Sequence, residues 1–233
     1  MKICVMGIPG LKPGKHNLKD PRLDQADKLV EADKKTCAQV DVVGEEGAAE
    51  TDAFLVNPER RADLILKDLE FVETRLSRNP PEPEQKVLTK MKSLLENDQL
   101  IADAGLSQEE FQAVAAHSFY TKKPVTVAKT EELEALEGLL LRAFKDAGYI
   151  SFLTVGGKEN RAWAVRKGAT AWEAAGAIHS DIQKGFIRAE VISFQDFIDG
   201  GGETQAKRAG KQRLETKAYV IQDCDLVNFR FNK

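Results

Sequence analysis

Apolar and polar residues alternate most clearly in the last third of the chain, from about Gly148 to its end. Four segments there repeat with a period of two and are predicted as β-strands: Arg161–Val165, Phe186–Ile192, Tyr219–Gln222 and Leu226–Phe231. Between the first two segments, Thr170 and Glu173 have the spacing of a capping box, which predicts the start of a helix. Small apolar residues follow on one face of this helix, so it is suited to lying close against a sheet. This part of the chain is predicted to be a small α+β domain.

The first part of the chain combines short apolar runs with helical periods. Lys2–Met6 is predicted as a buried strand and Gln39–Val43 as a second strand. Helical spacing begins after Asn57-Pro58, a capping residue followed by a proline at the first helical position, and resumes after the proline-rich stretch 79–84. Two apolar stripes separated by a short turn predict an antiparallel helical hairpin over about residues 57–97.

Two helices and a strand are predicted between this hairpin and the C-terminal domain. Ser107 and Glu110 form a second capping-box pattern, which predicts a helix to about Ser118 with His117 near its end. The segment "KKPVTVAK" then predicts a strand, and "ELEALEGLLLRAFKDAGY" has the period of an amphipathic helix. The predicted domains are therefore residues 1–147 and residues 148–233.

Composition and charge are those of an ordinary soluble protein, with 42% hydrophobic and 30% charged residues. From Gly148 onward there are 13 Lys and Arg against 10 Asp and Glu, about +3, which leaves about −6 for the rest. A basic C-terminal module favours an acidic partner such as RNA. The three cysteines are widely spaced and no apolar run reaches the length of a membrane span, so a cytoplasmic protein without disulfides or a zinc site is expected.

The stretch "GIPGLKPGKHNL" after the first predicted strand can be compared with a phosphate-binding loop, G-x-x-x-x-G-K-[ST]. The spacing from Gly7 to Gly14 is two residues too long, and Pro13 lacks a backbone amide that such a loop would use. Lys15 is present, but His16 stands where the magnesium-binding hydroxyl belongs. A strand followed by a Gly/Pro loop is the favoured interpretation, and a phosphate site is the alternative.

Several stretches resemble the YchF/Obg-like ATPase family. "GATAWEAAG", "IHSDIQKGFIRAE" and "DLVNFRFN" resemble its C-terminal TGS-type domain, and the likeness extends over residues 148–233. "DPRLD" (20–24) is similar to a segment near the first switch, and "ILKDLEFVETRL" (65–76) resembles the start of the coiled-coil insertion. Asp41-Val42-Val43-Gly44 matches the D-x-x-G motif, whose aspartate helps to hold magnesium in the family. The resemblance implies a ubiquitin-like β-grasp domain attached to a GTPase-type domain, in proteins linked to ribosomes and translation.

Relative to that family the nucleotide site is reduced. The stretch between the loop and the DPRLD-like segment is nearly absent, and Lys129 stands where the base-recognition motif Asn-x-x-Glu has its asparagine. The predicted fold class is α/β plus α+β: a reduced P-loop-GTPase-like sheet domain with an antiparallel helical hairpin, followed by a β-grasp TGS domain. If ATP or GTP binds with magnesium, the candidate residues share glycine-loop or D-x-x-G positions: Gly7, Gly14, Lys15, Asp41 and Gly44. No catalytic residue, metal site or cofactor is otherwise predicted, because His16, His117 and His179 lie far apart without a nucleophile nearby in sequence.

The leading hypothesis is a non-hydrolysing binding or regulatory module whose TGS-type domain contacts RNA, the ribosome or a translation protein. The candidate contacts are cations in the C-terminal part, which could hold phosphates without reading sequence: Lys184, Arg188, Lys207, Arg208, Lys211 and Arg213. A residual ATP or GTP hydrolase is the alternative, and a protein-interaction role for the hairpin is a third possibility. Nothing in the sequence points to DNA or to a membrane.

Overall fold

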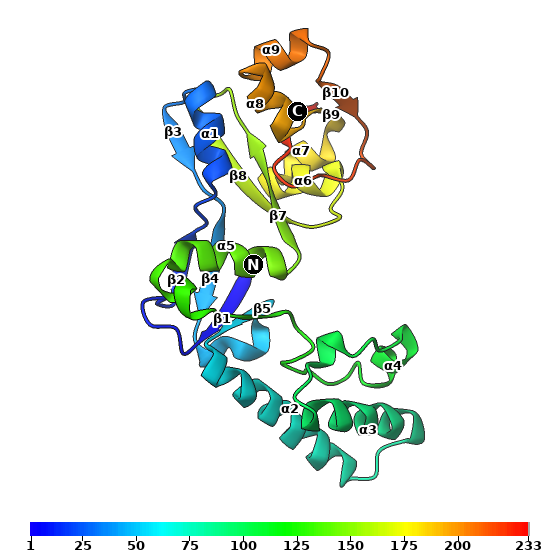
Figure 1. Ribbon diagram of the computed structural model, residues 1–233. Helices are drawn as coiled ribbons and strands as arrows, with labels where there is room; N and C mark the ends of the chain where they lie inside the picture. The colour runs from blue at the N-terminus through cyan, green and yellow to red at the C-terminus, as the bar shows by residue number, and fades with distance from the viewer. Residues whose placement is uncertain (233) are drawn as a thin grey trace. The chain divides into compact units, whose positions relative to one another are not determined.

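The computed structural model describes residues 1–232, which form two compact units (Figure 1). Unit 1 comprises Met1–Lys15 and Asp41–Ala147. Unit 2 comprises His16–Val40 together with the chain from Gly148 onward. One junction between the units thus falls between residues 147 and 148, but the stretch His16–Val40, which the sequence division placed with the first domain, packs with the C-terminal part of the chain.

A five-stranded sheet with the order β2-β4-β1-β5-β6 forms the centre of unit 1, although the end of β2 and the start of β4 belong to the stretch His16–Val40. Its strands are β1 (Lys2–Met6), β2 (Gly14–Asn17), β4 (Gln39–Val43), β5 (Ala53–Val56) and β6 (Val125–Val127). β1 lies parallel to both β4 and β5, and β5 lies parallel to β6. Strands with parallel neighbours on both sides are buried on both faces, which explains why β1 and β5 are almost continuously apolar. The strands predicted at Lys2–Met6 and Gln39–Val43 are confirmed.

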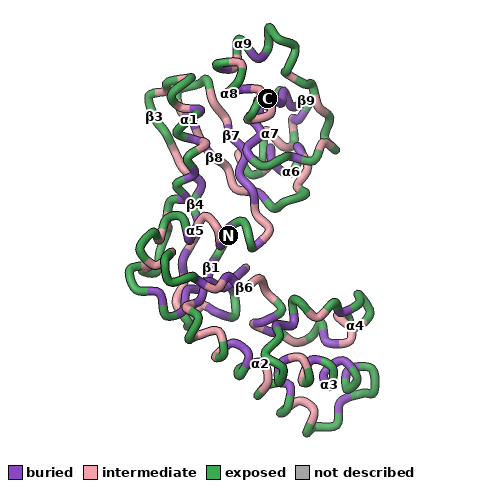
Figure 2. Tube along the Cα trace, in the orientation of Figure 1, coloured by how far each residue is buried: buried purple, intermediate pink, exposed green. Residues whose placement is uncertain are grey.

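The predicted helical hairpin is confirmed as α2 (Arg61–Leu76) and α3 (Glu82–Glu96). Asn57 caps the preceding 3-10 turn, Pro58–Arg60, because its side chain accepts a hydrogen bond from the Glu59 amide. The facing sides of the two helices are buried (Figure 2) in one apolar cluster that includes Ile65, Val72, Leu88, Met91 and Leu95. The apolar stripes read from the sequence are therefore a packing seam.

Unit 1 also contains four shorter elements: 3-10 turns at Glu45–Glu50, Ile101–Asp103 and Thr130–Glu134, and α4 (Gln108–Ala113). The Ser107–Glu110 capping box of α4 is present, but α4 ends at Ala113 and not near Ser118. The helix stops because Val114 leaves helical geometry and is buried with Phe119 against the hairpin. His117 is therefore beyond the helix, with its Nε2 2.8 Å from Glu84 Oε1. The predicted amphipathic helix is α5 (Leu136–Asp146).

Unit 2 contains a six-stranded mixed sheet with the order β10-β9-β11-β7-β8-β3. Its strands are β3 (Lys34–Thr36), β7 (Tyr149–Thr154), β8 (Glu159–Arg166), β9 (Phe186–Ile192), β10 (Arg213–Glu215) and β11 (Leu226–Phe231). Three of the four predicted strands are present. The prediction for Tyr219–Gln222 is wrong: this segment makes only an isolated bridge from Val220 to Thr170, because it pairs with the loop before a helix and not with a strand of the sheet.

Helices lie on both faces of this sheet: α1 (Pro21–Leu29), α6 (Ala171–Ile178), α7 (Ser180–Lys184), α8 (Phe194–Gly200) and α9 (Glu203–Arg208). The predicted Thr170–Glu173 capping box opens α6, whose small residues Ala174 and Ala175 are completely buried. They pack on Phe152, Val227 and other inward residues of the strands. α1 packs on the other face, against β8 and α8. Among the described residues, no helix is both long enough and apolar enough to cross a membrane.

Three kinds of contact attach residues 16–40 to the rest of unit 2. β3 extends the sheet by pairing in parallel with β8, with Lys34 opposite Glu159. Arg22 donates to both Asp20 and Asp223, the latter 201 positions later in the chain. The fully buried Asn160 donates to Asp27 Oδ1 and to the carbonyl of Val30, at 2.8 and 2.5 Å. Unit 2 is therefore assembled from two distant parts of the sequence.

Candidate functional site

The loop after β1 does not lead into a helix. Gly7 and Gly10 have φ of +69° and +90°, and the chain then forms β2, in which Gly14 and Lys15 are exposed. The next helix, α1, begins only at Pro21 and belongs to unit 2. A phosphate-binding loop depends on the amides and the positive dipole end of the helix that it opens. That part of the cradle is missing after Gly7.

The D-x-x-G match is not brought to the same place as this loop. In the register of the sheet Asp41 lies opposite Lys2, whereas Gly7 follows the other end of β1. Five residues of strand separate Lys2 from Gly7, about 16 Å. Of the five residues proposed for nucleotide binding, Gly7 and Gly44 therefore follow the C-terminal ends of neighbouring parallel strands. Asp41 lies nearer the N-terminal ends of the same strands.

The space around Gly7 and Gly44 is occupied by charged side chains of unit 1. A side chain at Gly7 would collide with Cγ of Arg60, 2.7 Å from the ideal Cβ position. Arg60 in turn pairs with Glu45 at 2.7 Å and with Asp63. Burial, together with the charges of Glu45 and Glu46, raises the pKa of the nearby Cys4 thiol to about 11. Two carboxylates directly after Gly44 repel a triphosphate and do not attract one.

The six cations predicted in the C-terminal part do not form one cluster. Lys207 pairs with Glu203 at 2.6 Å, and Lys211 pairs with Asp196 at 3.1 Å. Arg213 pairs with Glu215 and donates to the Tyr219 hydroxyl, which donates to Asp225. The charges of these three are partly neutralised. Within residues 1–232, Lys184, Arg188 and Arg208 form no ion pair with a carboxylate.

One face of strands β9, β10 and β11 carries several exposed side chains. In β11, Val227 and Phe229 point into the apolar core, while Asn228 and Arg230 alternate with them and are exposed. In β9, Arg188 lies directly opposite Arg230. In β10, Leu214 lies opposite Glu190 and has 57% of its surface exposed. We call the surface formed by Arg188, Glu190, Leu214, Asn228 and Arg230 the open face.

Glu190 is the one residue of the open face that is buried, with 8% of its surface exposed. Burial alone would raise the pKa of its carboxyl, but hydrogen bonds from Arg230 and Asn228 outweigh burial and hold the pKa below its usual value. Lys207 contributes in the same direction. Glu190 is therefore ionised at neutral pH and holds the Arg230 side chain in position. Arg188 donates only to the carbonyl of its neighbour Ile187, at 2.9 Å.

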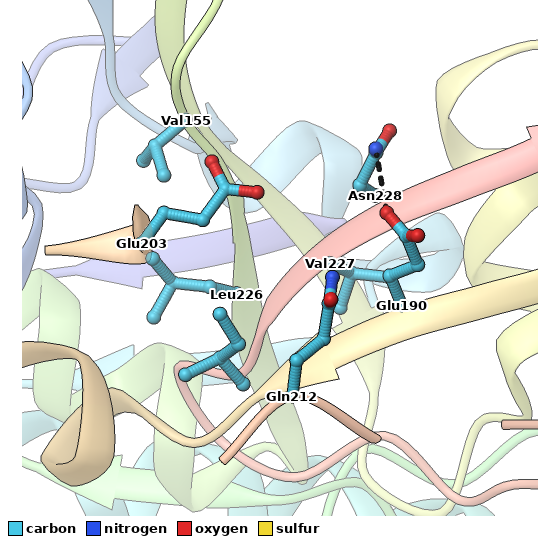
Figure 3. Close-up of a pocket in the computed structure, with 8 residues that line it drawn as sticks. Val155, Glu190, Glu203, Gln212, Leu226, Val227 and Asn228 are labelled. Atoms are coloured by element: carbon cyan, nitrogen blue, oxygen red, sulfur yellow. Dashed lines mark hydrogen bonds between the residues drawn. The ribbon is translucent and has the colours of Figure 1, made fainter. Parts of the chain in front are cut away.

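A small cavity of about 20 Å³ lies beside Glu190 (Figure 3). Asn228 and Glu190 lie on one side of it, and Glu203 lies beside Val155 on the other. Gln212 and apolar side chains of β9 and β11 complete its wall. The volume is about that of one water molecule. The described residues contain no group of three or more His, Cys, Asp or Glu placed to hold a metal ion, and Cys4, Cys37 and Cys224 form no disulfide among themselves.

Sequence reasoning named only Arg188 of the open face and missed Glu190, Leu214, Asn228 and Arg230. The alternation in "DLVNFRFN" places Asn228 and Arg230 on one side of the strand and was available from the sequence. The pairing of Arg230 with Arg188 depends on strand order and register, and these are not encoded in either strand alone.

Comparisons with known proteins agree with the resemblance read from the sequence. Residues 149–232 match the family model YchF-GTPase_C, described as a protein of unknown function (DUF933). The Ribosome-binding ATPase YchF of Haemophilus influenzae is 36% identical over 202 residues, which cover 64% of this chain and 56% of that protein. The Bacillus subtilis protein of the same name is 32% identical over 235 residues, which cover 73% of this chain and 64% of that protein.

The chain thus spans between about half and two thirds of the length of these two relatives. The structure of the Schizosaccharomyces pombe YchF GTPase superimposes with a TM-score of 0.76 at 20% identity, covering 99% of this chain and 97% of that one, which is a likeness of fold. The chain is thus similar to YchF proteins in sequence and in fold.

Proposed function

We propose that this YchF-related chain is a binding module that associates with the ribosome or its RNA and does not hydrolyse nucleotide. In this proposal unit 2 is a TGS-type β-grasp domain, with α6 lying across its sheet, and unit 1 is a reduced GTPase-like domain. The two relatives are named as ribosome-binding ATPases, and we propose only the ribosome binding, not the ATPase activity, for this chain. A ribosomal partner implies a cytoplasmic location.

The observation that carries the proposal is the path of the chain after Gly7. Phosphoryl transfer depends almost entirely on positioning and on charge stabilisation. Here the loop continues into β2, Lys15 is an exposed strand residue, and Arg60 and Glu45 occupy the space beside Gly7 and Gly44. With no helix N-terminus at the loop and carboxylates beside it, tight triphosphate binding is not expected.

Two measurements on the full chain test the proposal. Isothermal titration with millimolar ATP or GTP and magnesium should give no saturable heat, and added nucleotide should not raise the melting temperature. Saturable, magnesium-dependent binding that Lys15→Ala abolishes would establish the alternative, a residual ATP or GTP hydrolase. Co-sedimentation with ribosomes should be measurable at about 50 mM salt and should fall steeply by 200 mM. Failure to co-sediment at any salt concentration would refute the binding role.

A further inference from the structure

The open face carries a pair of like charges that the fold itself does not need. Arg188 and Arg230 are directly opposite each other on the antiparallel strands β9 and β11. Like charges at directly opposed positions destabilise a strand pair. Glu190 offsets one of the two charges through Arg230, and no carboxylate of the described chain pairs with Arg188. An exposed, incompletely neutralised arginine pair is what an anion-binding site presents in the absence of its ligand.

We infer that Arg188 and Arg230 form a phosphate clamp by which the open face holds the backbone of an RNA duplex. This inference deepens the proposed function, on which it rests, by naming the surface and the chemical group that it grips. Two guanidinium groups on adjacent strands can each give two parallel N–H donors to one phosphate or to neighbouring phosphates. Glu190 positions Arg230 for this and leaves its remaining donors exposed.

The chemistry of the face favours a duplex backbone over splayed single-stranded bases. Proteins that hold single strands stack the bases on aromatic side chains, and the exposed positions of the open face have none. Apart from the two arginines and the buried Glu190, the face consists of an amide, Asn228, and an apolar side chain, Leu214, both exposed. Recognition of duplex RNA relies on shape and on phosphate and 2′-hydroxyl contacts, which arginine and amide donors can supply.

The geometry also separates this clamp from two other cations of unit 2, Lys211 and Arg213. Arg213 lies opposite Val191, so its side chain is on the face of β10 away from Leu214, where it donates to Tyr219. Lys211 is held by Asp196 of α8. These two residues should therefore contribute little to RNA binding. The clamp predicts that Arg188 and Arg230 matter more for binding than Lys211 and Arg213, whereas a count of charges would treat all four alike.

The test measures binding of a fluorescein-labelled RNA duplex of about 20 base pairs to the full chain by fluorescence anisotropy at about 50 mM salt. Arg188→Gln and Arg230→Gln should each weaken binding about tenfold, the loss expected for one charged hydrogen-bonding contact. In the double variant, the slope of log affinity against log salt concentration should be smaller in magnitude by about two. Arg188→Lys should retain part of the affinity. Lys211→Gln should have little effect, and so should Arg78→Gln, a matched change at an exposed arginine in the hairpin of unit 1.

Equal affinity of the Arg188→Gln and Arg78→Gln variants would overturn the clamp, as would an absence of duplex binding by the parent chain. Competition by polyglutamate as effective as that by RNA would overturn it as well, because the face would then fit an acidic protein. Ribosome co-sedimentation that persists unchanged in the Arg188→Gln, Arg230→Gln variant would reject the clamp and leave the proposed function standing. Tryptophan-fluorescence melts should show every unit 2 variant folded at the assay temperature. Arg188→Gln should melt like the parent, whereas Arg230→Gln should melt somewhat lower because the buried Glu190 loses a donor.

Discussion

Replacing Arg22 with methionine tests whether residues 16–40 are a structural part of unit 2. Arg22 Nε and Nη2 donate to Asp20, and Nη1 and Nη2 donate to Asp223 at 2.8 and 3.1 Å. The exposed fractions of the side chains are 24% for Arg22, 7% for Asp20 and 34% for Asp223. Methionine keeps an unbranched apolar stem of similar reach and removes every one of these donors.

The expected loss of stability lies between that of a surface pair and that of a buried pair. Exposed ion pairs contribute about 0–1 kcal/mol, whereas breaking a buried pair costs about 3–5 kcal/mol because a charge stays buried without a partner. Asp20 is nearly buried but still accepts from the Arg22 amide as the cap of α1, and Asp223 is partly solvated. We therefore expect about 2 kcal/mol. With a urea dependence of about 2 kcal/mol per molar, the midpoint should fall by about 1 M.

The sequence provides a selective reporter for this experiment. Its two tryptophans, Trp163 and Trp172, both lie in unit 2, so tryptophan fluorescence follows the unfolding of that unit. The Arg22→Met transition should shift to lower urea, while Arg78→Met, in the hairpin turn of unit 1, should leave it unchanged. Asp223→Asn should add little to Arg22→Met, since the two share one interaction. If Arg22→Met and Arg78→Met unfold at the same urea concentration, residues 16–40 are not part of the folded unit.

Two further predictions concern the hairpin and the glycines. Hydrogen bonds from Arg75 and His117 lower the pKa of Glu84 to about 2, so the hairpin should lose stability as the pH falls from about 4.5 towards 2. Urea unfolding followed by circular dichroism at 222 nm should show this slope. Glu84→Gln should make the slope smaller but not remove it, because other carboxyls with a lowered pKa, such as Glu110, still contribute. Gly185→Ala should destabilise unit 2 by about 1–3 kcal/mol, because the added Cβ would overlap the carbonyl oxygen of Asn232. Gly138→Ala, in open space on α5, should instead stabilise its helix by about 0.5–1 kcal/mol. The melting temperatures of the two variants should therefore move in opposite directions from that of the parent.

Local signals in the sequence predicted the elements that local physics determines. The capping boxes at Thr170 and Ser107 act within one helical turn, and the buried strands β1 and β9 carry their own apolar pattern. β2 and β3 have no such signal, because Gly14–Asn17 and Lys34–Thr36 are short, polar segments that are strands only through pairing with their neighbours. The strand predicted at Tyr219–Gln222 failed for the opposite reason, since its alternation is present but no strand lies beside it.

The candidate sites show the same division between local and long-range information. The defects of the loop after Gly7 could be read from spacing, Pro13 and His16, and the structure adds the reason that Asp41 lies about 16 Å along the sheet from Gly7. Charge counting identified Arg188 but could not separate it from Lys211 and Arg213, which carboxylates and Tyr219 engage. The partnership of Arg188 with Arg230 required the register of β9 and β11.

The anchoring of residues 16–40 also bears on whether the chain can act as a nucleotide switch. A switch requires a second arrangement within a few kcal/mol of the first and a ligand that binds the two with different affinity. The DPRLD-like segment is held by the Arg22 contacts with Asp20 and Asp223, by the hydrogen bonds of buried Asn160 and by the pairing of β3 with β8. Releasing it would remove the acceptors of the buried Asn160 amide, at about 1–3 kcal/mol for each polar group left unpaired in the interior. A loop without its helix has little binding energy with which to drive that release, so a static binding role follows more directly from this fold than a switching one.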